Sequence, residues 1–406
     1  MRNPIYYLPG FIAFCAIVCL GAVSIRAQNS VREFHKILRE KAALTDIDFA
    51  TLDRQQTVVH LLPATDKREV AVCGLVKLQV PAEVFLQSFL ESMTQKSNPA
   101  ILEIGRFSAT PTVADLQTLT IEDRDIDDLK ECVVGNCKIK LSALMIERLH
   151  SEVDWEAPDY RVQAAQLLKR MLADYVRNYL ARGDSALIEY NDKADEIRLA
   201  DEHQHLIAAP GYVNTALTEF RQQLKGTNKP PLSVVEDAIV WSKIKFGLKP
   251  VIAVNHITVY RREQESGPQI LIASKQIYAN HYFDSSLALT AFVNIPGAAP
   301  ESYLVYENRS RTDGLGGMFS RMKRGLVEDR AVASLKTILE SSKASLNARL
   351  LTNAESNSTN QAEWSWGRWR ISRVQLFLLL SLITALVALL ALRNYGWGSL
   401  SGEAHR

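Results

Sequence analysis

VWSKIKFGLKPVIAVNHITVYRREQESGPQILIASKQIYANHYF, residues 240–283, is the stretch that decides the fold of this chain. From Val240 to Leu248 small or apolar residues alternate with Trp241, Lys243 and Lys245. A repeat of two residues is typical of a strand that buries one face. Pro250 ends the alternation, so the first strand is predicted to stop just before it.

The rest of this region continues the same pattern. Turn residues 265–268 separate two strands that are predicted to form a hairpin, and two further strands follow; the four are Val251 to Arg262, Gln269 to Phe283, Ser286 to Ile295 and Glu301 to Arg309. Five consecutive strands over residues 234–311 imply an antiparallel meander. A helix is predicted over 317–350. The fold class expected is therefore α+β, a curved antiparallel sheet closed by a long C-terminal helix.

The third of these strands has one polar-aromatic side and one apolar side. Strict alternation places five polar or aromatic side chains on one face, and together with His256 they are the candidates for lining a ligand cavity: Ser274, Gln276, Tyr278, Asn280 and Tyr282. A histidine on a strand is more often bonded or exposed than functional. The hypothesis therefore depends on whether these side chains converge.

The start of the final helix is rich in glycine and basic residues. Backbone amides of Gly316 and Gly317, with the side chains of Arg321 and Arg324, are candidates for holding an anionic head group. The alternative is a flexible loop followed by a solvated basic helix end. The apolar face of the helix changes sides near Gly325, which predicts a bend or break there.

The order of elements resembles the helix-grip fold of the START and Bet v 1-like superfamily. A strand over Val70 to Val80, a helix opened by Pro81, the meander and the final helix carry the resemblance, with a helical insertion near 140–230 as the departure. The resemblance implies an apolar cavity for lipids, sterols or other hydrophobic molecules between sheet and helix. No family motif is present, so it transfers no binding residue.

Both ends of the chain carry membrane-targeting signals. Residues 1–27 match a secretory signal peptide, with an uncleaved anchor as the alternative. Val374 to Leu392 holds no charged residue and is flanked by tryptophans and tyrosine, which predicts one transmembrane helix. The expected organisation is an exported domain over 28–351, a tether over 352–370 and a short cytoplasmic tail over 393–406, which places the domain outside the cytoplasm at the membrane.

Cys132 and Cys137 flank a Gly-Asn turn, so a disulfide is predicted in an oxidising compartment, with two free thiols as the alternative. Cys73 would remain a buried thiol. No second Cys or His pair has zinc-ligand spacing. Asp123, Asp125 and Asp127 begin like a calcium loop, but the glycine and the bidentate glutamate of that loop are absent, so a solvated loop or helix start is expected.

Composition excludes some functions and leaves several open. Lys plus Arg (47) nearly balances Asp plus Glu (45), which argues against nucleic acid as a partner. We expect a non-enzymatic protein that binds a hydrophobic ligand or lipid, without cofactor or metal. One alternative is a structural or partner-binding envelope protein. Another is a hydrolase-like enzyme in the same cavity, in which His256 or His281 would act as acid or base.

Overall fold

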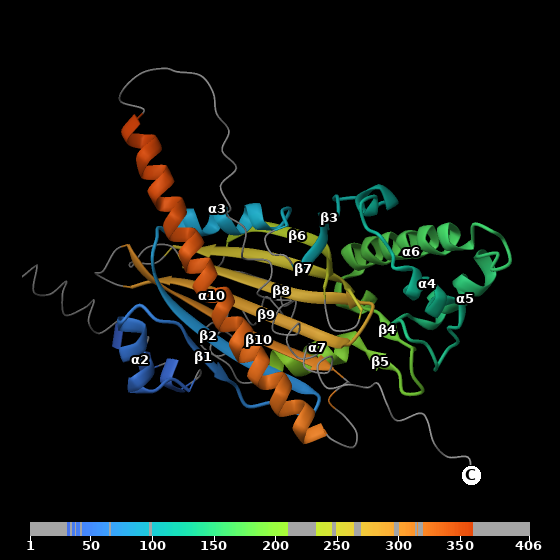
Figure 1. Ribbon diagram of the computed structural model, residues 1–406, viewed down its shortest axis with the longest axis horizontal. Coiled ribbons are helices and arrows are strands. Elements are labelled where there is room, and N and C mark those ends of the chain that lie inside the picture. The colour runs from blue at the N-terminus through green and yellow to red at the C-terminus, as the bar shows by residue number, and fades with distance from the viewer. Residues whose placement is uncertain are drawn as a thin grey trace, which may run out of the picture.

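The computed structural model describes residues 31–359 except for 33–34, 37, 41–42, 65, 97–99, 210–232, 246–248, 264–268, 296–299, 313–314 and 316–319. The fold is α+β and is built on a large antiparallel sheet of eight strands in the order β1-β2-β10-β9-β8-β7-β6-β3 (Figure 1). β1 and β3 are the two edges, so the sheet formed by the described strands is open and not a closed barrel.

The strands confirm the predicted meander. β6 to β10 pair in chain order, and the eight strands are β1 (Val58–Leu61), β2 (Glu69–Gln79), β3 (Ile101–Arg106), β6 (Ser233–Ile244), β7 (Val251–Arg262), β8 (Gln269–Ala279), β9 (Phe283–Asn294) and β10 (Glu301–Thr312). The early strand β2 pairs along its whole length with the last strand β10. The first and last parts of the fold therefore meet inside the sheet, one strand in from the β1 edge.

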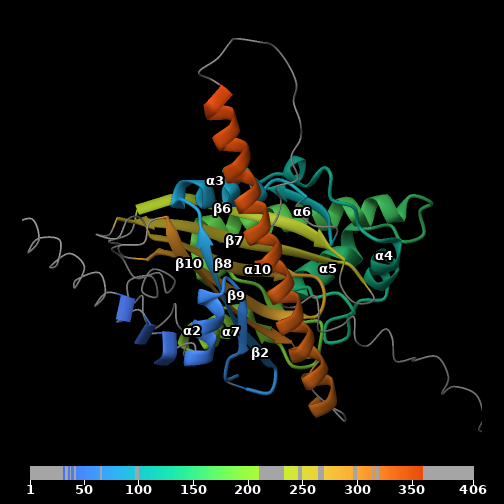
Figure 2. The ribbon, with the colours of Figure 1, turned by 60° about the vertical axis from the view of Figure 1, so that its left-hand side comes forward.

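Alternation along β2 shows how the two faces of the sheet are used. Val70, Val72, Val76 and Leu78 join a core that contains α3 (Ala82–Ser92) and α10 (Ser320–Thr359). The β2 residues that alternate with these point to the other face, where they join a second core with α2 (Asp46–Asp53) and α7 (Leu199–Ala208). We call these sides the α10 face and the α7 face. Figure 2 shows α10 crossing in front of the strands, on the α10 face.

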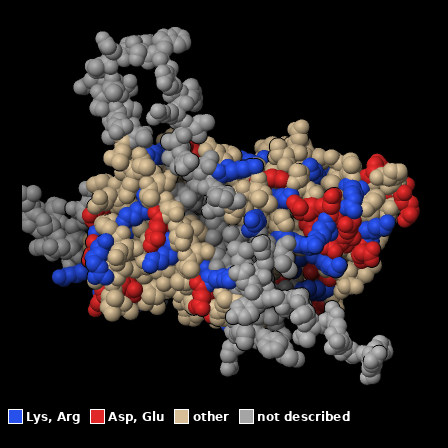
Figure 3. Space-filling model, in the orientation of Figure 1, with Lys and Arg blue, Asp and Glu red and all other residues tan. Residues whose placement is uncertain are grey.

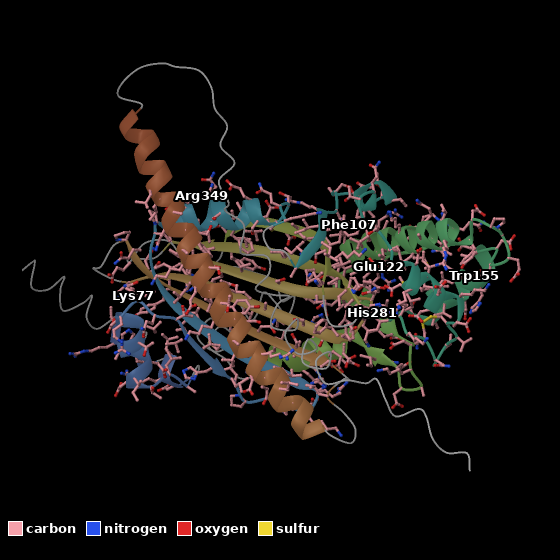
Figure 4. All side chains as sticks on the ribbon, in the orientation of Figure 1. Lys77, Phe107, Glu122, Trp155, His281 and Arg349 are labelled. Carbon is pink, nitrogen blue, oxygen red and sulfur yellow. A yellow bond between two sulfur atoms is a disulfide. The ribbon has the colours of Figure 1, made fainter. Side chains whose placement is uncertain are left out.

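The final helix packs directly on β2. A Cβ atom added to Gly74 would lie 2.6 Å from Leu339 and 3.0 Å from Leu335, so a glycine is required at this close approach. α10 is one continuous helix through Gly325, which makes the prediction of a break there wrong. It also reaches Thr359 instead of ending at Leu350, so the first part of the predicted tether is helical. An ion pair between Arg349 and Glu91 of α3, 2.6 Å long, fixes the crossing (Figure 4).

The helical insertion lies between β3 and β6 and begins earlier than predicted. It contains α4 (Asp123–Lys130), α5 (Ala143–Glu152), α6 (Tyr160–Arg182) and the small hairpin of β4 (Glu189–Tyr190) and β5 (Ile197–Arg198), as well as α7. These helices form a core against the β6 to β8 end of the sheet, on the face opposite α10. Figure 3 shows acidic and basic side chains gathered over this end of the molecule.

Residues 201–205, a polar stretch in the sequence, are part of α7. His203 of this stretch is buried and its Nε2 donates to the Gln276 carbonyl at 2.7 Å, which anchors α7 to β8. Burial and the charge of Lys275 lower the pKa of His203 to about 3, so the ring is neutral at physiological pH. A tertiary contact thus overrides a polar local sequence.

The predicted signal peptide, most of the tether and the segment Val374 to Leu392 lie outside the described residues. Among the helices that the structure describes, none combines the length and apolar character needed to cross a bilayer. The membrane topology therefore stays a prediction.

Candidate functional site

A band of buried polar side chains crosses the otherwise apolar α10 face. Ser274 on β8 lies opposite Ile257 on β7 and Ala288 on β9, both of which belong to the core beneath α10 and α3. Directly opposite residues of antiparallel strands point to the same side. Gln276 therefore faces the same way two residues on, opposite Asn255. The serine is 7% exposed and the glutamine 2%.

The β9 and β10 part of this band satisfies its own hydrogen bonds. Asn308 Nδ2 donates to Ser286 Oγ at 3.2 Å, the Ser286 and Ser310 hydroxyls lie 2.9 Å apart, and Ser310 Oγ donates to Asn308 Oδ1 at 2.9 Å. If the Ser286 hydroxyl donates to Ser310, the three side chains form a closed ring. These residues were missed from the sequence, because the pairing of β9 with β10 was needed to place them on one face.

The β8 part of the band is not satisfied. Ser274 Oγ and Gln276 Oε1 are buried and have no hydrogen-bond partner. Leaving one buried polar group unpaired costs about 1–3 kcal/mol. Such atoms are uncommon in native proteins and call for a bound water, ion or ligand. This pair is set among Ile257, Ile272 and Ala288 of the core beneath α10.

The other ligand-cavity candidates do not join this pair. The β7–β8 register shifts between Val254 and Asn255, so β8 has one extra residue at this point. The β8 side chains that follow this bulge therefore point to the other face of the sheet. Tyr278 consequently lies in the core beneath α6, with ring centroids 6.5 Å from Tyr175. Its phenol is buried without a partner, and burial together with Asp125 and Asp192 raises its pKa.

His256 also lies on the α6 side. Its Nδ1 is 2.8 Å from the Tyr179 hydroxyl and its Nε2 is 2.7 Å from Asp237. Burial, Asp184 and Tyr175 raise the pKa of Tyr179, so this phenol stays protonated and is the natural donor to Nδ1. Both ring nitrogens are thus hydrogen-bonded to protein groups, which hold the ring on the α6 side and away from Ser274 and Gln276.

Asn280 and Tyr282 belong to the turn between β8 and β9. Asn280 Oδ1 accepts from the Ile252 amide at 2.8 Å and its Nδ2 donates to Asp125 at 3.2 Å. Tyr282 has a φ of 62°, and its hydroxyl accepts from the Lys249 amide at 3.2 Å. Their polar atoms hold the turn and do not reach the band on the α10 face.

His281 joins the sheet to the helical insertion (Figure 4). Its Nε2 is 3.1 Å from both carboxylate oxygens of Asp125, and its Nδ1 is 3.2 Å from the Lys138 carbonyl. Both ring nitrogens thus lie within hydrogen-bonding distance of acceptor oxygens. Asp125, expected in a solvated region, is only 2% exposed, and Lys249 also donates to it at 3.0 Å. The contact is a structural ion pair.

The anionic head-group candidates receive no support. Gly316 and Gly317 lie outside the described residues, as does the side chain of Arg321. The Arg324 guanidinium donates to the Glu69 carbonyl at 2.7 and 3.0 Å and pairs with Glu328 at 3.1 Å. Its charge is therefore used within the fold, where it binds the start of β2.

Cys132 and Cys137 lie at disulfide-bonding distance, with Cα atoms 4.4 Å apart, and Gly135 between them has a φ of 83°. Cys73 is a free thiol on β2, and its burial raises its pKa, so it is unreactive where it stands. Among the residues that the structure describes, no group of three or more His, Cys, Asp or Glu side chains is placed to hold a metal ion.

Comparison of the chain with protein-family models, with curated proteins and with solved structures found no match.

Proposed function

We propose that this chain binds a mainly apolar molecule against the α10 face, over β7 to β9, with a donor group of the ligand bonded to Gln276 Oε1 and Ser274 Oγ. The observation that carries the proposal is this pair of buried polar atoms without partners. A few polar groups in a hydrophobic wall are typical of sites that bind small apolar molecules. A hydroxyl, amide or protonated carboxyl group would satisfy them.

In this proposal the ligand lies beside α10 and not beneath it. Leu335 and Leu339 already fill the space above Gly74 on β2. Further along the sheet, Phe85 of α3 stacks on Phe292 of β9 with centroids 4.8 Å apart, which supplies an aromatic wall next to the polar band. The proposed site is therefore bounded by α3, by α10 and by the strands that carry Ser274 and Gln276.

Two parts of the proposal concern the wider context. The pairing of β2 with β10, followed by α10 on one face, suits a helix-grip fold, whose cavity lies between sheet and last helix. The predicted segment Val374 to Leu392 would tether this exported binding domain to a membrane, the source of many apolar ligands. The site would act by binding alone.

The first test replaces Gln276 by methionine, which has similar size but no carbonyl oxygen. We expect the ligand-free protein to become more stable by about 1–3 kcal/mol, because an unpaired buried oxygen is removed. Binding of a fluorescent fatty alcohol, whose hydroxyl can donate to Gln276 Oε1, is expected to weaken about tenfold or more for the full-length chain in detergent, because the hydrogen bond to the ligand is lost. Chemical denaturation and fluorescence titration give the two values.

Thr290→Val is the matched control, since Thr290 lies on the same face, opposite Ile272, and is absent from the unpaired atoms. It is expected to bind the fatty alcohol like the wild type. Equal binding by wild type and Gln276→Met would contradict the proposed role of Gln276. Loss of stability in that variant would show that the oxygen already has a partner within the fold.

A further inference from the structure

A charged cleft lies away from the proposed ligand site. It has a volume of about 520 Å³ and is lined by Arg68, by residues 193–198 of the β4–β5 hairpin and by Asp201 and Glu202 of α7. A volume of this size suits a small molecule. None of its lining residues belongs to the band on the α10 face, so the two sites can be tested separately.

The wall of the cleft is held in place by the disulfide loop. The Gly135 amide donates to the Asn191 carbonyl at 2.8 Å and the Cys137 amide donates to the Asp192 carbonyl at 2.9 Å. Asn191 in turn accepts through its side chain from the Ala143 amide at 2.9 Å. The hairpin that carries residues 193–198 is thus fixed to the helical insertion before any ligand arrives.

Carboxylates dominate the charge of the cleft and of the layer behind it. The lining holds four carboxylates, Asp195, Glu196, Asp201 and Glu202, against three cations, Arg68, Lys193 and Arg198. The Arg68 guanidinium lies 3.1 Å from Glu202, 3.6 Å from Asp284 and 3.8 Å from Asp66. Asp284 is fully buried. Its Oδ1 accepts from Lys140 at 2.9 Å, whereas its Oδ2, which faces Arg68, accepts no hydrogen bond. Arg68 shares Asp66 and Glu202 with Arg311, and it shares Asp284 with Lys140.

The mouth of the cleft adds carboxylates with no cation of their own. Asp195 and Asp201 line the cleft, are exposed, and form no hydrogen bond or ion pair with any residue that the structure describes. Arg198 beside them is already paired with Glu196 at 3.0 Å and Glu189 at 3.5 Å. Negative charge is thus left uncompensated in a concave site, where it attracts cations most strongly.

We propose that this cleft binds a small organic cation that carries two or more ammonium groups, as a polyamine does. One ammonium group would lie between Asp195 and Asp201, and another would approach Glu202 at the edge of the cleft. A compact, multiply charged cation matches both the free carboxylates at the mouth and the excess of acidic groups behind them.

Isothermal titration of the full-length chain in detergent with spermidine tests this proposal. We expect saturable binding with one site per chain that weakens as sodium chloride is added, because exposed charges are screened. The double variant Asp195→Asn, Asp201→Asn is expected to weaken spermidine binding about tenfold or more. Both side chains are exposed and unpaired, so the variant should fold normally, which a thermal melt checks.

Glu147→Gln is the matched control, because it removes one exposed negative charge on α5 and should leave the spermidine affinity unchanged. Diacetylated spermidine, which has lost two of its charges, is expected to bind far more weakly. Spermidine binding that survives the double variant would overturn the proposal. A chain that does not bind spermidine at millimolar concentration would also overturn the proposal. Saturable binding of inorganic phosphate without spermidine binding would do the same, since the basic residues of the cleft would then select an anion.

Discussion

Replacing Leu339 by alanine is expected to lower the free energy of unfolding by about 2–5 kcal/mol, the usual cost of truncating a fully buried leucine. The side chain is 0% exposed and lies over Gly74, so the backbone of β2 and the helix axis restrict any collapse into the space that it leaves. Urea denaturation monitored by tryptophan fluorescence measures the change. The result tests whether α10 is an integral part of the sheet core.

Leu351→Ala provides the comparison on the same helix, because Leu351 is 68% exposed. It is expected to change stability by less than about 0.5 kcal/mol, as for ordinary surface substitutions. Equal effects of the two substitutions would mean that α10 does not grip the sheet in solution. The proposed site, which uses α10 as one of its walls, would then lose a boundary.

Replacing Asp125 by asparagine is expected to cost about 3–5 kcal/mol, since it removes the carboxylate from a buried ion pair and leaves its cations behind. Lys249 and His281 lie 3.0 and 3.1 Å from this carboxylate. Asp127→Asn, two residues away, is the matched control, because Asp127 is 55% exposed. This substitution is expected to leave the unfolding midpoint nearly unchanged. Similar effects of the two would contradict a structural role for the buried pair.

Because of the same Asp125 carboxylate, we expect the protein to lose stability in acid. Burial alone would raise the pKa of Asp125, but hydrogen bonds and charges from His281 and Lys249 outweigh it and lower that pKa below its usual value of 3.8. A lowered folded-state pKa contributes stability above the unfolded-state pKa, and this contribution disappears as pH falls through the folded-state value. Wild type should therefore lose more stability than Asp125→Asn between neutral pH and about pH 3. Parallel loss in both proteins would contradict this assignment.

The meander was predictable because each of its strands has local sequence signals, namely alternating side chains and turn residues at its ends. β7 (Val251–Arg262) was predicted with its bounds, and Pro250 and residues 265–268 supplied its limits. α6 (Tyr160–Arg182) carries a similar local signal, since its apolar face repeats at helical spacing and Gly183 follows its end. Local periodicity and turn residues carry this information.

The candidate site was harder to predict, because it depends on pairing between distant strands. The extra residue in β8 moves Tyr278 to the α6 side, and strict alternation cannot reveal such a bulge. Ser286 and Ser310 meet only through the β9–β10 register. Of the six residues expected to line a cavity, Ser274 and Gln276 lie together on the α10 face. Alternation along a single strand was enough to predict that these two share a face.

The charged cleft was missed for a related reason. Arg68, the β4–β5 hairpin and α7 come from three separate parts of the chain, and each looks like a solvated polar segment by itself. Asp284 and Arg311 pair there with partners more than 60 residues away in sequence, such as Lys140 and Glu202. Only the packing of the insertion against the sheet brings these charges together.

The most direct test of the proposed function is native mass spectrometry of the full-length chain, purified in a detergent that can be removed in the gas phase, with organic extraction and identification of any co-purified molecule. The account predicts one apolar molecule with a hydrogen-bond donor per chain, retained by Thr290→Val and lost from Gln276→Met. A wild-type chain that carries no such molecule, and that takes up none when incubated with membrane lipid extract, would contradict it.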